Sequence, residues 1–309
     1  MIEAMGLTKR YGQRAAVDDI DFVVRPGAVT GFLGPNGAGK STTMRMILGL
    51  TRPTDGEVLV GGRSFVREAA PLTRVGALLD AKAIHPGRSA YHHLLALAAT
   101  HRIPVRRVRE VIELTGLESV ANKRVGGFSL GMGQRLGIAG AILGDPEVLI
   151  FDEPVNGLDP EGVRWVRNLA RHYAAEGRTV FLSSHLMSEV AQTADHVIVI
   201  GRGRILADAP VAEIVRGGGA DRVRVRTSRA GELAQLLGRS GATVASEESG
   251  VLEITGLDSD TIAEQAVQAG IVLLELTPIT STLEDAYLAL TDDAVEYRTE
   301  SPETQEVAR

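Results

Sequence analysis

The chain has 309 residues, of which 44% are hydrophobic and 23% charged, with 12 prolines and no cysteine. This composition excludes collagen-like, low-complexity and intrinsically disordered chains, and without cysteine there are no disulfides or thiolate metal sites. The formal net charge of −6 has the wrong sign for nucleic-acid binding over the whole surface. No stretch approaches the ~18 consecutive apolar residues of a membrane span, and no signal peptide is recognisable, so we expect a cytosolic chain.

The first two thirds of the chain predict strands alternating with helices. Runs rich in β-forming residues between turn formers predict strands, and apolar residues at helical spacing predict helices. The expected strands are 2–7, 19–24, 28–34, 57–60, 75–79, 148–151, 179–183 and 196–200. The expected helices are 40–50, 160–175 and 186–193, with a helical insertion over 90–143 that is broken at Pro104, Gly116 and Gly126-Gly127. This alternation indicates an α/β layer fold.

The last third predicts a second, smaller domain after a glycine-rich linker. Strands at 222–227, 242–246, 251–255 and 271–276, with helices at 230–239 and 259–269, give the order βαββαβ. That order favours a ferredoxin-like α+β domain. A last helix, Thr282 to Leu290, places Leu283, Ala286, Tyr287 and Leu290 on one face. We expect these boundaries: 1–216 for the first domain with a helical subdomain at about 82–145, 217–220 for the linker, 221–291 for the accessory domain and 292–309 for a disordered acidic tail.

A glycine-rich loop between an expected strand and an expected helix carries the clearest chemical signal. It consists of Gly34, Pro35, Asn36, Gly37, Ala38, Gly39, Lys40, Ser41 and Thr42. Glycines let backbone N–H groups approach a phosphate chain, and the N-terminus of the following helix favours an anion. Lys40 can reach the β- and γ-phosphates, and Ser41 can bind Mg²⁺. The loop therefore predicts binding of a nucleoside triphosphate.

Two adjacent carboxylates end the apolar run Val148–Phe151. In a doubly wound sheet, ligands lie at the carboxyl ends of the strands, so Asp152 and Glu153 are expected beside the phosphate loop. Asp152 can hold the metal, and Glu153 can polarise a water aimed at the γ-phosphate. The pair therefore predicts hydrolysis as well as binding.

These features resemble the nucleotide-binding subunit of an ATP-binding cassette (ABC) transporter over about residues 1–216. The resemblance rests on the phosphate loop, Asp152-Glu153 and three further stretches: FSLGMGQR at 128–135, NGLDP at 156–160 and SSH at 183–185. It implies a P-loop fold of the ABC ATPase type with a helical subdomain. It also implies that Ser129 and Gly131 clamp the γ-phosphate bound by an opposing subunit.

The resemblance implies further roles, and the sequence departs from the family pattern at two places. Asp159 would lie at the dimer interface, His185 would contact the γ-phosphate, and Tyr11 would stack on adenine. The usual S-G-G-Q reads Ser129-Leu-Gly131-Met here, which keeps the serine and the second glycine. Asp80 stands where the family has a magnesium-sensing glutamine, and a carboxylate there is an expected, weaker metal ligand.

The expected function is ATP hydrolysis that powers a membrane transporter, with ATP and Mg²⁺ as ligands. The S-L-G-M form, the DEPVNGLDP string and the LEDAYLAL helix resemble ATPase subunits of bacterial drug exporters of the daunorubicin-resistance type. This implies a homodimer formed through the nucleotide sites, an integral membrane permease as partner, no nucleic acid, and a peripheral location on the cytoplasmic face of the membrane. One alternative is a soluble ABC ATPase acting on DNA or ribosomes; another is a regulatory module that binds ATP without turnover.

Overall fold

The computed structural model describes residues 1–81, 83–217, 222–248, 250–279 and 282–291. The chain divides into two compact units. One is Met1–Val211 with the end of the last helix from Leu290, and the other is Ala212–Ala289. Each has its own hydrophobic core. Most of the predicted linker, residues 218–220, and the predicted tail, residues 292–309, lie outside the described residues.

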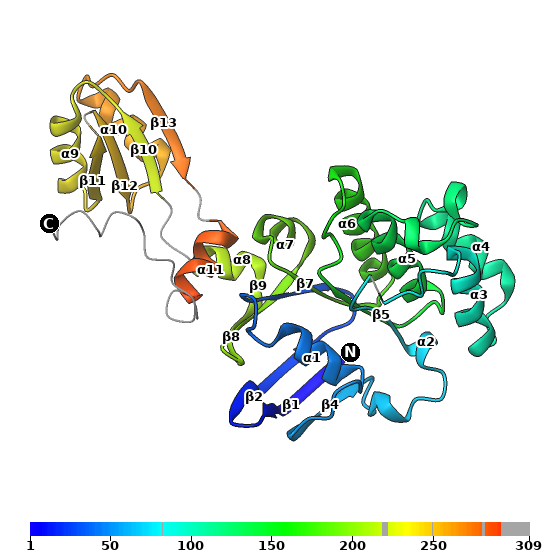
Figure 1. Ribbon diagram of the computed structural model, residues 1–309. Coiled ribbons are helices and arrows are strands. Elements are labelled where there is room, and N and C mark those ends of the chain that lie inside the picture. Colours follow the sequence, from blue (N-terminus) through cyan, green and yellow to red (C-terminus); the bar gives the residue numbers. More distant parts are fainter. Residues whose placement is uncertain (82, 218–221, 249, 280–281, 292–309) are drawn as a thin grey trace, which may run out of the picture. The chain divides into compact units, whose positions relative to one another are not determined.

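The strands of the first unit form two sheets (Figure 1). One has six strands in the order β5-β6-β7-β3-β8-β9, in which only the pair β8 and β9 is antiparallel. The other is antiparallel, in the order β2-β1-β4. Their bounds are β1 Ile2–Tyr11, β2 Arg14–Val24, β3 Val29–Leu33, β4 Asp55–Val60, β5 Val75–Leu78, β6 Val148–Asp152, β7 Thr179–Ser184, β8 His196–Gly201 and β9 Arg204–Pro210.

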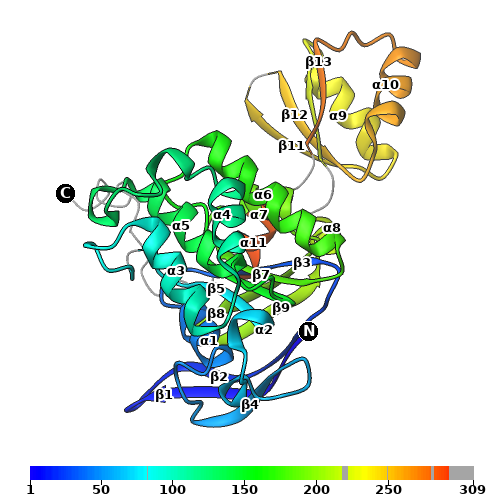
Figure 2. The ribbon, with the colours of Figure 1, turned by 90° about the vertical axis from the view of Figure 1, so that its right-hand side faces the viewer.

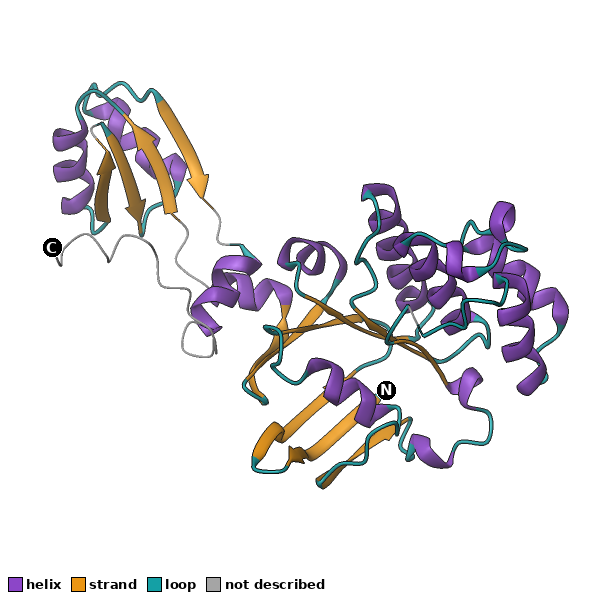
Figure 3. Cartoon of the chain, in the orientation of Figure 1, coloured by secondary structure: helices purple, strands orange, loops and turns teal. Residues whose placement is uncertain are grey.

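The helices of this unit fall into two groups. Helix α1 contacts β2, β4 and β6 and so lies between the two sheets, while α6 and α7 pack against β3 and β7. Helices α3, α4 and α5 contact one another and form a purely helical region (Figures 2 and 3). The bounds are α1 Lys40–Ile47, α2 Pro71–Arg74, α3 Ala90–Thr100, α4 Val105–Leu114, α5 Leu130–Ile142, α6 Pro160–Ala175 and α7 Met187–Thr193, with short 3₁₀ turns η1 Phe65–Arg67, η2 Glu118–Val120 and η3 Val125–Gly127.

Three aromatic rings mark the centre of the core that the two sheets share. Phe22 of β2, Phe32 of β3 and Phe181 of β7 are buried, and the centroids of the Phe32 and Phe181 rings lie 5.1 Å apart. Such rings bury a large apolar area and stabilise each other in tilted and offset arrangements. The core therefore fixes β3 against β7, the two strands whose carboxyl ends carry parts of the site.

The second unit contains an antiparallel sheet that packs with helices α9 and α10, and it also includes most of α8 and α11. The sheet has the order β11-β12-β10-β13, and its inward residues pack with α9 and α10. In β10, Val223 and Val225 are buried while the three arginines between and beside them are exposed, which is the alternation of a strand with one covered face. The bounds are α8 Val211–Gly217, β10 Arg222–Arg226, α9 Ala230–Arg239, β11 Thr243–Glu248, β12 Val251–Thr255, α10 Ser259–Gln268, β13 Glu275–Ile279 and α11 Leu283–Thr291.

The structure corrects several expected elements. The strand expected at 271–276 is wrong: β13 begins at Glu275, because Arg226, the last residue of β10, pairs with that residue. Val272 and Leu274 are exposed despite their apolar side chains. The helix expected at 40–50 ends at Ile47, and β9 was not expected.

Candidate functional site

Three neighbouring parallel strands end at the same edge of the six-stranded sheet. The phosphate loop follows β3, Asp152 and Glu153 end β6, and His185 follows β7. Since β7 lies between β6 and β3, segments from three distant parts of the sequence meet there. This is the edge at which doubly wound sheets bind ligands.

Two of the three glycines in the phosphate loop, Gly34 and Gly39, leave no space for a Cβ. A Cβ on Gly34 would lie 2.3 Å from the carbonyl oxygen of Ile200. Gly39 has a φ of +115°, and a Cβ there would lie 2.6 Å from the carbonyl oxygen of Ala16. The loop is thus packed closely against neighbouring backbone, and it leads directly into the N-terminus of α1.

Lys40 is buried at the start of α1 with its ammonium turned back into the loop. Its Nζ donates to the carbonyl oxygen of Gly34 at 2.5 Å and to that of Pro35 at 3.3 Å. Burial lowers the pKa of Lys40, while the carboxylates of Glu153 and Asp152 act in the opposite direction. Lys40, the only cationic residue of the loop, therefore lies close to the carboxylates of Asp152 and Glu153.

Asp152 accepts hydrogen bonds from two serine hydroxyls. Ser41 Oγ lies 2.6 Å from its Oδ2, and Ser183 Oγ lies 2.5 Å from its Oδ1. Hydroxyl and carboxylate oxygens are the hard ligands that Mg²⁺ prefers, and Mg²⁺ is usually bound by few protein ligands together with water and phosphate oxygens. The described residues contain no cluster of three or more acidic or histidine ligands. The pair Ser41 and Asp152 thus fits a magnesium site completed by a nucleotide.

Glu153 is held by hydrogen bonds with four other residues, one of them Asn156, whose backbone N–H donates to the carbonyl oxygen of Glu153 at 3.3 Å. The backbone of Glu153 has a φ of +51°, which is unusual for a residue other than glycine. Its N–H donates to Ser183 Oγ at 3.0 Å, and its carbonyl oxygen accepts from Nε2 of Gln134 at 3.0 Å. Its carboxylate lies 2.7 Å from Nδ1 of His185. The glutamate is therefore fixed through its backbone and its side chain.

A cavity of about 270 Å³ lies between the loop and the carboxylates. It is lined by Ala16, Pro35, Asn36, Gly37, Gly39, Lys40, Ser41, Thr42, Leu79, Asp152 and Glu153. The ammonium of Lys40 and the N-terminus of α1 favour a phosphate chain there. Leu79 lines the cavity, whereas Asp80 is exposed and is not part of the lining. Tyr11, at the end of β1, is 55% exposed.

The residues predicted to reach a second nucleotide lie at helix starts. Ser129 caps α5 by accepting from the N–H of Met132, and Asp159 caps α6 by accepting from that of Gly162. A Cβ on Gly131 would lie 3.1 Å from the carbonyl oxygen of Gly157, so the first turn of α5 packs closely on the loop before α6. Neither Ser129 nor Gly131 lines the phosphate-loop cavity.

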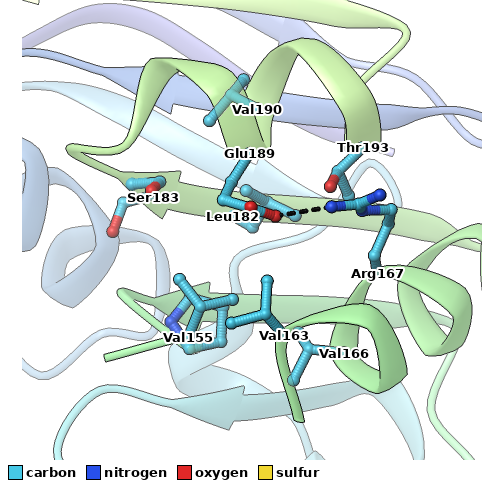
Figure 4. Close-up of a pocket in the computed structure, with 11 residues that line it drawn as sticks. Val155, Val163, Val166, Arg167, Leu182, Ser183, Glu189, Val190 and Thr193 are labelled. Carbon is cyan, nitrogen blue, oxygen red and sulfur yellow. Dashed lines mark hydrogen bonds and ion pairs between the residues drawn. The ribbon is translucent and has the colours of Figure 1, made fainter. Parts of the chain in front are cut away.

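An ion pair joins helices α6 and α7, which follow the segments that carry Glu153 and His185 (Figure 4). Arg167 of α6 donates to Glu189 of α7 at 2.8 Å, beside a small apolar pocket of about 20 Å³ to which Val163 and Val190 contribute. Helix α6 begins after Asp159, and α7 begins just after His185. The pair therefore links the loop beyond Glu153 to the segment that carries the histidine.

Sequence reasoning did not assign a role to Gln134 or Ser183. Ser183 donates to the carboxylate of Asp152, and Gln134 donates to the backbone carbonyl oxygen of Glu153. Their neutral side chains have no distinctive spacing, and the only available signal was their place within the quoted stretches 128–135 and 183–185. Arg14 and Arg202 were also missed; they line a second cavity of about 230 Å³ that shares Ala16 with the first.

Comparisons with known proteins agree with this geometry. The family model described as "ABC transporter" matches residues 17–156, and a domain of unknown function matches residues 221–284. A bacitracin transport ATP-binding protein of Bacillus licheniformis is 43% identical over 68% of this chain and 70% of its own length. A daunorubicin resistance ATP-binding protein of Streptomyces coeruleorubidus is 34% identical over 93% of this chain and 95% of its own. A lantibiotic transport ATP-binding protein of Streptococcus pyogenes is 34% identical over 67% and 90%.

Solved structures share the fold. The ATP-binding subunit of an ABC transporter superposes with a TM-score of 0.65 at 26% identity, over 70% of this chain and 92% of that one. A dimeric bacterial ABC transporter cassette superposes with a TM-score of 0.63 at 23% identity, over 68% and 98%. None of the described helices meets the length and apolarity needed to cross a membrane. The chain belongs to the ATP-binding proteins of ABC transporters, the subunits that bind and hydrolyse ATP to power transport.

Proposed function

We propose that two copies of the chain associate so that Ser129 and Gly131 of each copy complete the nucleotide site of the other. The lining of the phosphate-loop cavity carries this proposal: it includes Lys40 and Glu153 but no described residue from 128–135. Ser129 is exposed at the N-terminus of α5, where backbone N–H groups favour an anion. A site shared by two identical chains requires two-fold symmetry, which gives two ATP molecules per dimer.

The chemistry follows from the residues around that cavity. Lys40 and the loop N–H groups hold the phosphates, and Tyr11 is proposed to stack on adenine. Ser41 and Asp152 would hold Mg²⁺, which neutralises charge developing on the phosphate oxygens. The carboxylate of Glu153 accepts a proton from the attacking water. As this happens, the oxygen of the water bonds to the γ-phosphorus, and the bond between the γ-phosphorus and the β–γ bridging oxygen breaks. His185 holds that carboxylate through Nδ1–H, since an ionised carboxylate only accepts hydrogen bonds.

We further propose export of antibiotics or other small molecules as the work that hydrolysis drives. The relatives' names support this class, because they refer to bacitracin and lantibiotic transport and to daunorubicin resistance. The chain would bind an integral membrane permease on the cytoplasmic face of the membrane, and closure of the dimer on ATP would move that partner. The accessory unit has the element order βαββαβ and the sheet order β11-β12-β10-β13, which support a ferredoxin-like domain.

Light scattering on the purified chain tests the shared site. Glu153→Gln keeps the size of the side chain but removes the base, so this variant is expected to bind Mg-ATP without turnover and to run as a dimer with Mg-ATP and as a monomer without it. Adding Ser129→Arg should abolish the ATP-dependent dimer by placing a bulky side chain against the partner's nucleotide.

Ser64→Arg in the Glu153→Gln background is the matched control, because Ser64 is also exposed and makes no capping hydrogen bond. This control should still dimerise. A Glu153→Gln protein that binds ATP and stays monomeric at high concentration would refute the shared site. Export is tested separately, by identifying the membrane protein that co-purifies with the chain and measuring antibiotic resistance of cells that express both.

A further inference from the structure

Gln134 is a buried polar side chain of helix α5. It lies in the second turn of α5 and is only 5% exposed, between buried residues such as Leu136. Its Nε2 donates to the carbonyl oxygen of Glu153 at 3.0 Å. Its Oε1 is buried and has no hydrogen-bond partner within the part of the chain that the structure describes. The NH₂ group of this amide therefore makes a hydrogen bond, whereas its oxygen makes none within the described residues.

The orientation of this amide is determined by its single partner. A flipped side chain would place Oε1 against the carbonyl oxygen of Glu153, and two acceptors repel each other. A buried acceptor without a partner destabilises the fold, so the amide is a poor choice for stability alone. An apolar side chain of similar length would fill the same space without that cost. The contribution of Gln134 is then the hydrogen bond that its N–H group donates to the carbonyl oxygen of Glu153.

Glu153 needs support because of its backbone conformation. A φ of +51° is strained for a residue with a Cβ, and such conformations persist only where the surroundings hold them. Three hydrogen bonds hold this one: Ser183 Oγ receives its N–H, and its carbonyl oxygen accepts from Gln134 Nε2 at 3.0 Å and, at 3.3 Å, from the backbone N–H of Asn156. The backbone conformation in turn directs the carboxylate toward His185 and the phosphate-loop cavity.

We infer that Gln134 is a positioning residue for Glu153, and that through it the placement of α5 governs the aim of the catalytic carboxylate. The first turn of α5, with Gly131 against Gly157, and its second turn, with Gln134 against Glu153, contact the same segment. Helix α5 therefore contacts residues 153–157 at two points. The inference rests on the proposed roles of Glu153 and of Ser129, which caps this helix.

Steady-state hydrolysis by Gln134→Met tests the positioning. Methionine keeps the unbranched shape and removes the donor, so kcat should fall about 10- to 100-fold with KM and ATP affinity within about twofold of the unmodified chain. The thermal unfolding midpoint should not fall. Gln134→Leu repeats the test if the first variant does not fold. Gln235→Met, at an exposed glutamine of α9 in the second unit, is the matched control and should leave kcat unchanged.

Single-turnover rates of the double variant show whether Gln134 acts through Glu153. Once Glu153→Gln has removed the base, adding Gln134→Met should lower the residual rate by less than about twofold. A further drop of tenfold would place the effect elsewhere and overturn the inference. Provided that Glu153→Gln is inactive, two results for Gln134→Met would also overturn the inference. One is an unchanged kcat, and the other is a raised KM with kcat unchanged. If Glu153→Gln itself hydrolyses ATP at the full rate, the proposed role of Glu153 fails first, and with it the inference.

Discussion

Nδ1 of His185 lies 2.7 Å from Oε2 of Glu153, and the backbone N–H of His185 points to the same oxygen at 3.4 Å. The two residues are 32 positions apart in the sequence but follow neighbouring parallel strands, β7 and β6. Half of the histidine side chain remains exposed, against a fifth for the glutamate. The imidazole thus covers the carboxylate from the solvent side.

Replacing His185 by alanine should lower kcat by about 100-fold, because the carboxylate of Glu153 loses the group that holds it. ATP affinity should change much less, since Lys40 and the loop glycines remain. The measurement is phosphate release at saturating ATP, with nucleotide binding followed separately. His172→Ala is the control, because His172 is an exposed histidine of α6 paired only with Glu176 among the described residues. Equal rates for the two variants would contradict the role of His185.

Lys40 should make the free energy of unfolding of the chain change with pH in the alkaline range. Burial lowers the pKa of Lys40 in the folded chain, whereas the pKa of a lysine side chain in the unfolded chain is about 10.4. Between those two values the unfolded state binds more protons, so the free energy of unfolding rises with pH relative to a Lys40→Met variant. Below the folded-state pKa the difference between the two proteins is constant.

Urea unfolding of the nucleotide-free chain at several pH values between 7 and 10.5 measures this difference. Lys9→Met is the control, because Lys9 is not buried and, within the described part of the chain, its Nζ contacts the carbonyl oxygen of Arg52 and the ring of Tyr11. A free energy of unfolding of the unmodified chain that stays constant or falls, relative to that of Lys40→Met, as pH rises would contradict the prediction. ATPase activity of Lys40→Met should be lost, by 100-fold or more.

Ser183→Ala should raise the Mg²⁺ concentration needed for half-maximal activity by about 10-fold. The hydroxyl bonds Asp152 Oδ1 and the N–H of Glu153, and groups that orient a metal ligand change metal affinity by about 10- to 100-fold when removed. ATPase titrations with MgCl₂ at fixed ATP measure this. Ser188→Ala, at an exposed serine of α7, should leave the titration unchanged. Identical titrations for Ser183→Ala and the unmodified chain would refute the prediction.

Removing Arg167 should destabilise the first unit by about 1–3 kcal/mol, because Glu189 would be left without its partner in a mostly covered position. Arg167→Met combined with Glu189→Gln should cost less than the sum of the two single changes. Urea unfolding midpoints give these values. Arg171→Met, at an exposed arginine of the same helix, should have little effect. If the losses in free energy of unfolding of the two single variants simply add up in the double variant, the ion pair contributes nothing to stability.

The sequence predicted the parts of the site whose chemistry demands unusual residues. Gly34, Gly39 and Lys40 form a pattern with few other uses, and an apolar strand that ends in two carboxylates is similarly distinctive. Ser183 and Gln134 were not predicted because a single hydrogen bond to backbone or carboxylate leaves no periodic trace in a sequence. Among the strands, β9 was missed although the turn Gly201-Arg202-Gly203, between the apolar run of β8 and the alternating run of β9, is a hairpin signal.

The position of β3 in its sheet has a consequence for synthesis of the chain. β3 is made early, at residues 29–33, yet its strand partners are β7 and β8, at residues 179–201. Until those residues have left the ribosome, the strand that leads into the phosphate loop has no neighbour to pair with in the central sheet. ATP therefore cannot bind a nascent chain in the native manner before about two thirds of it has been translated.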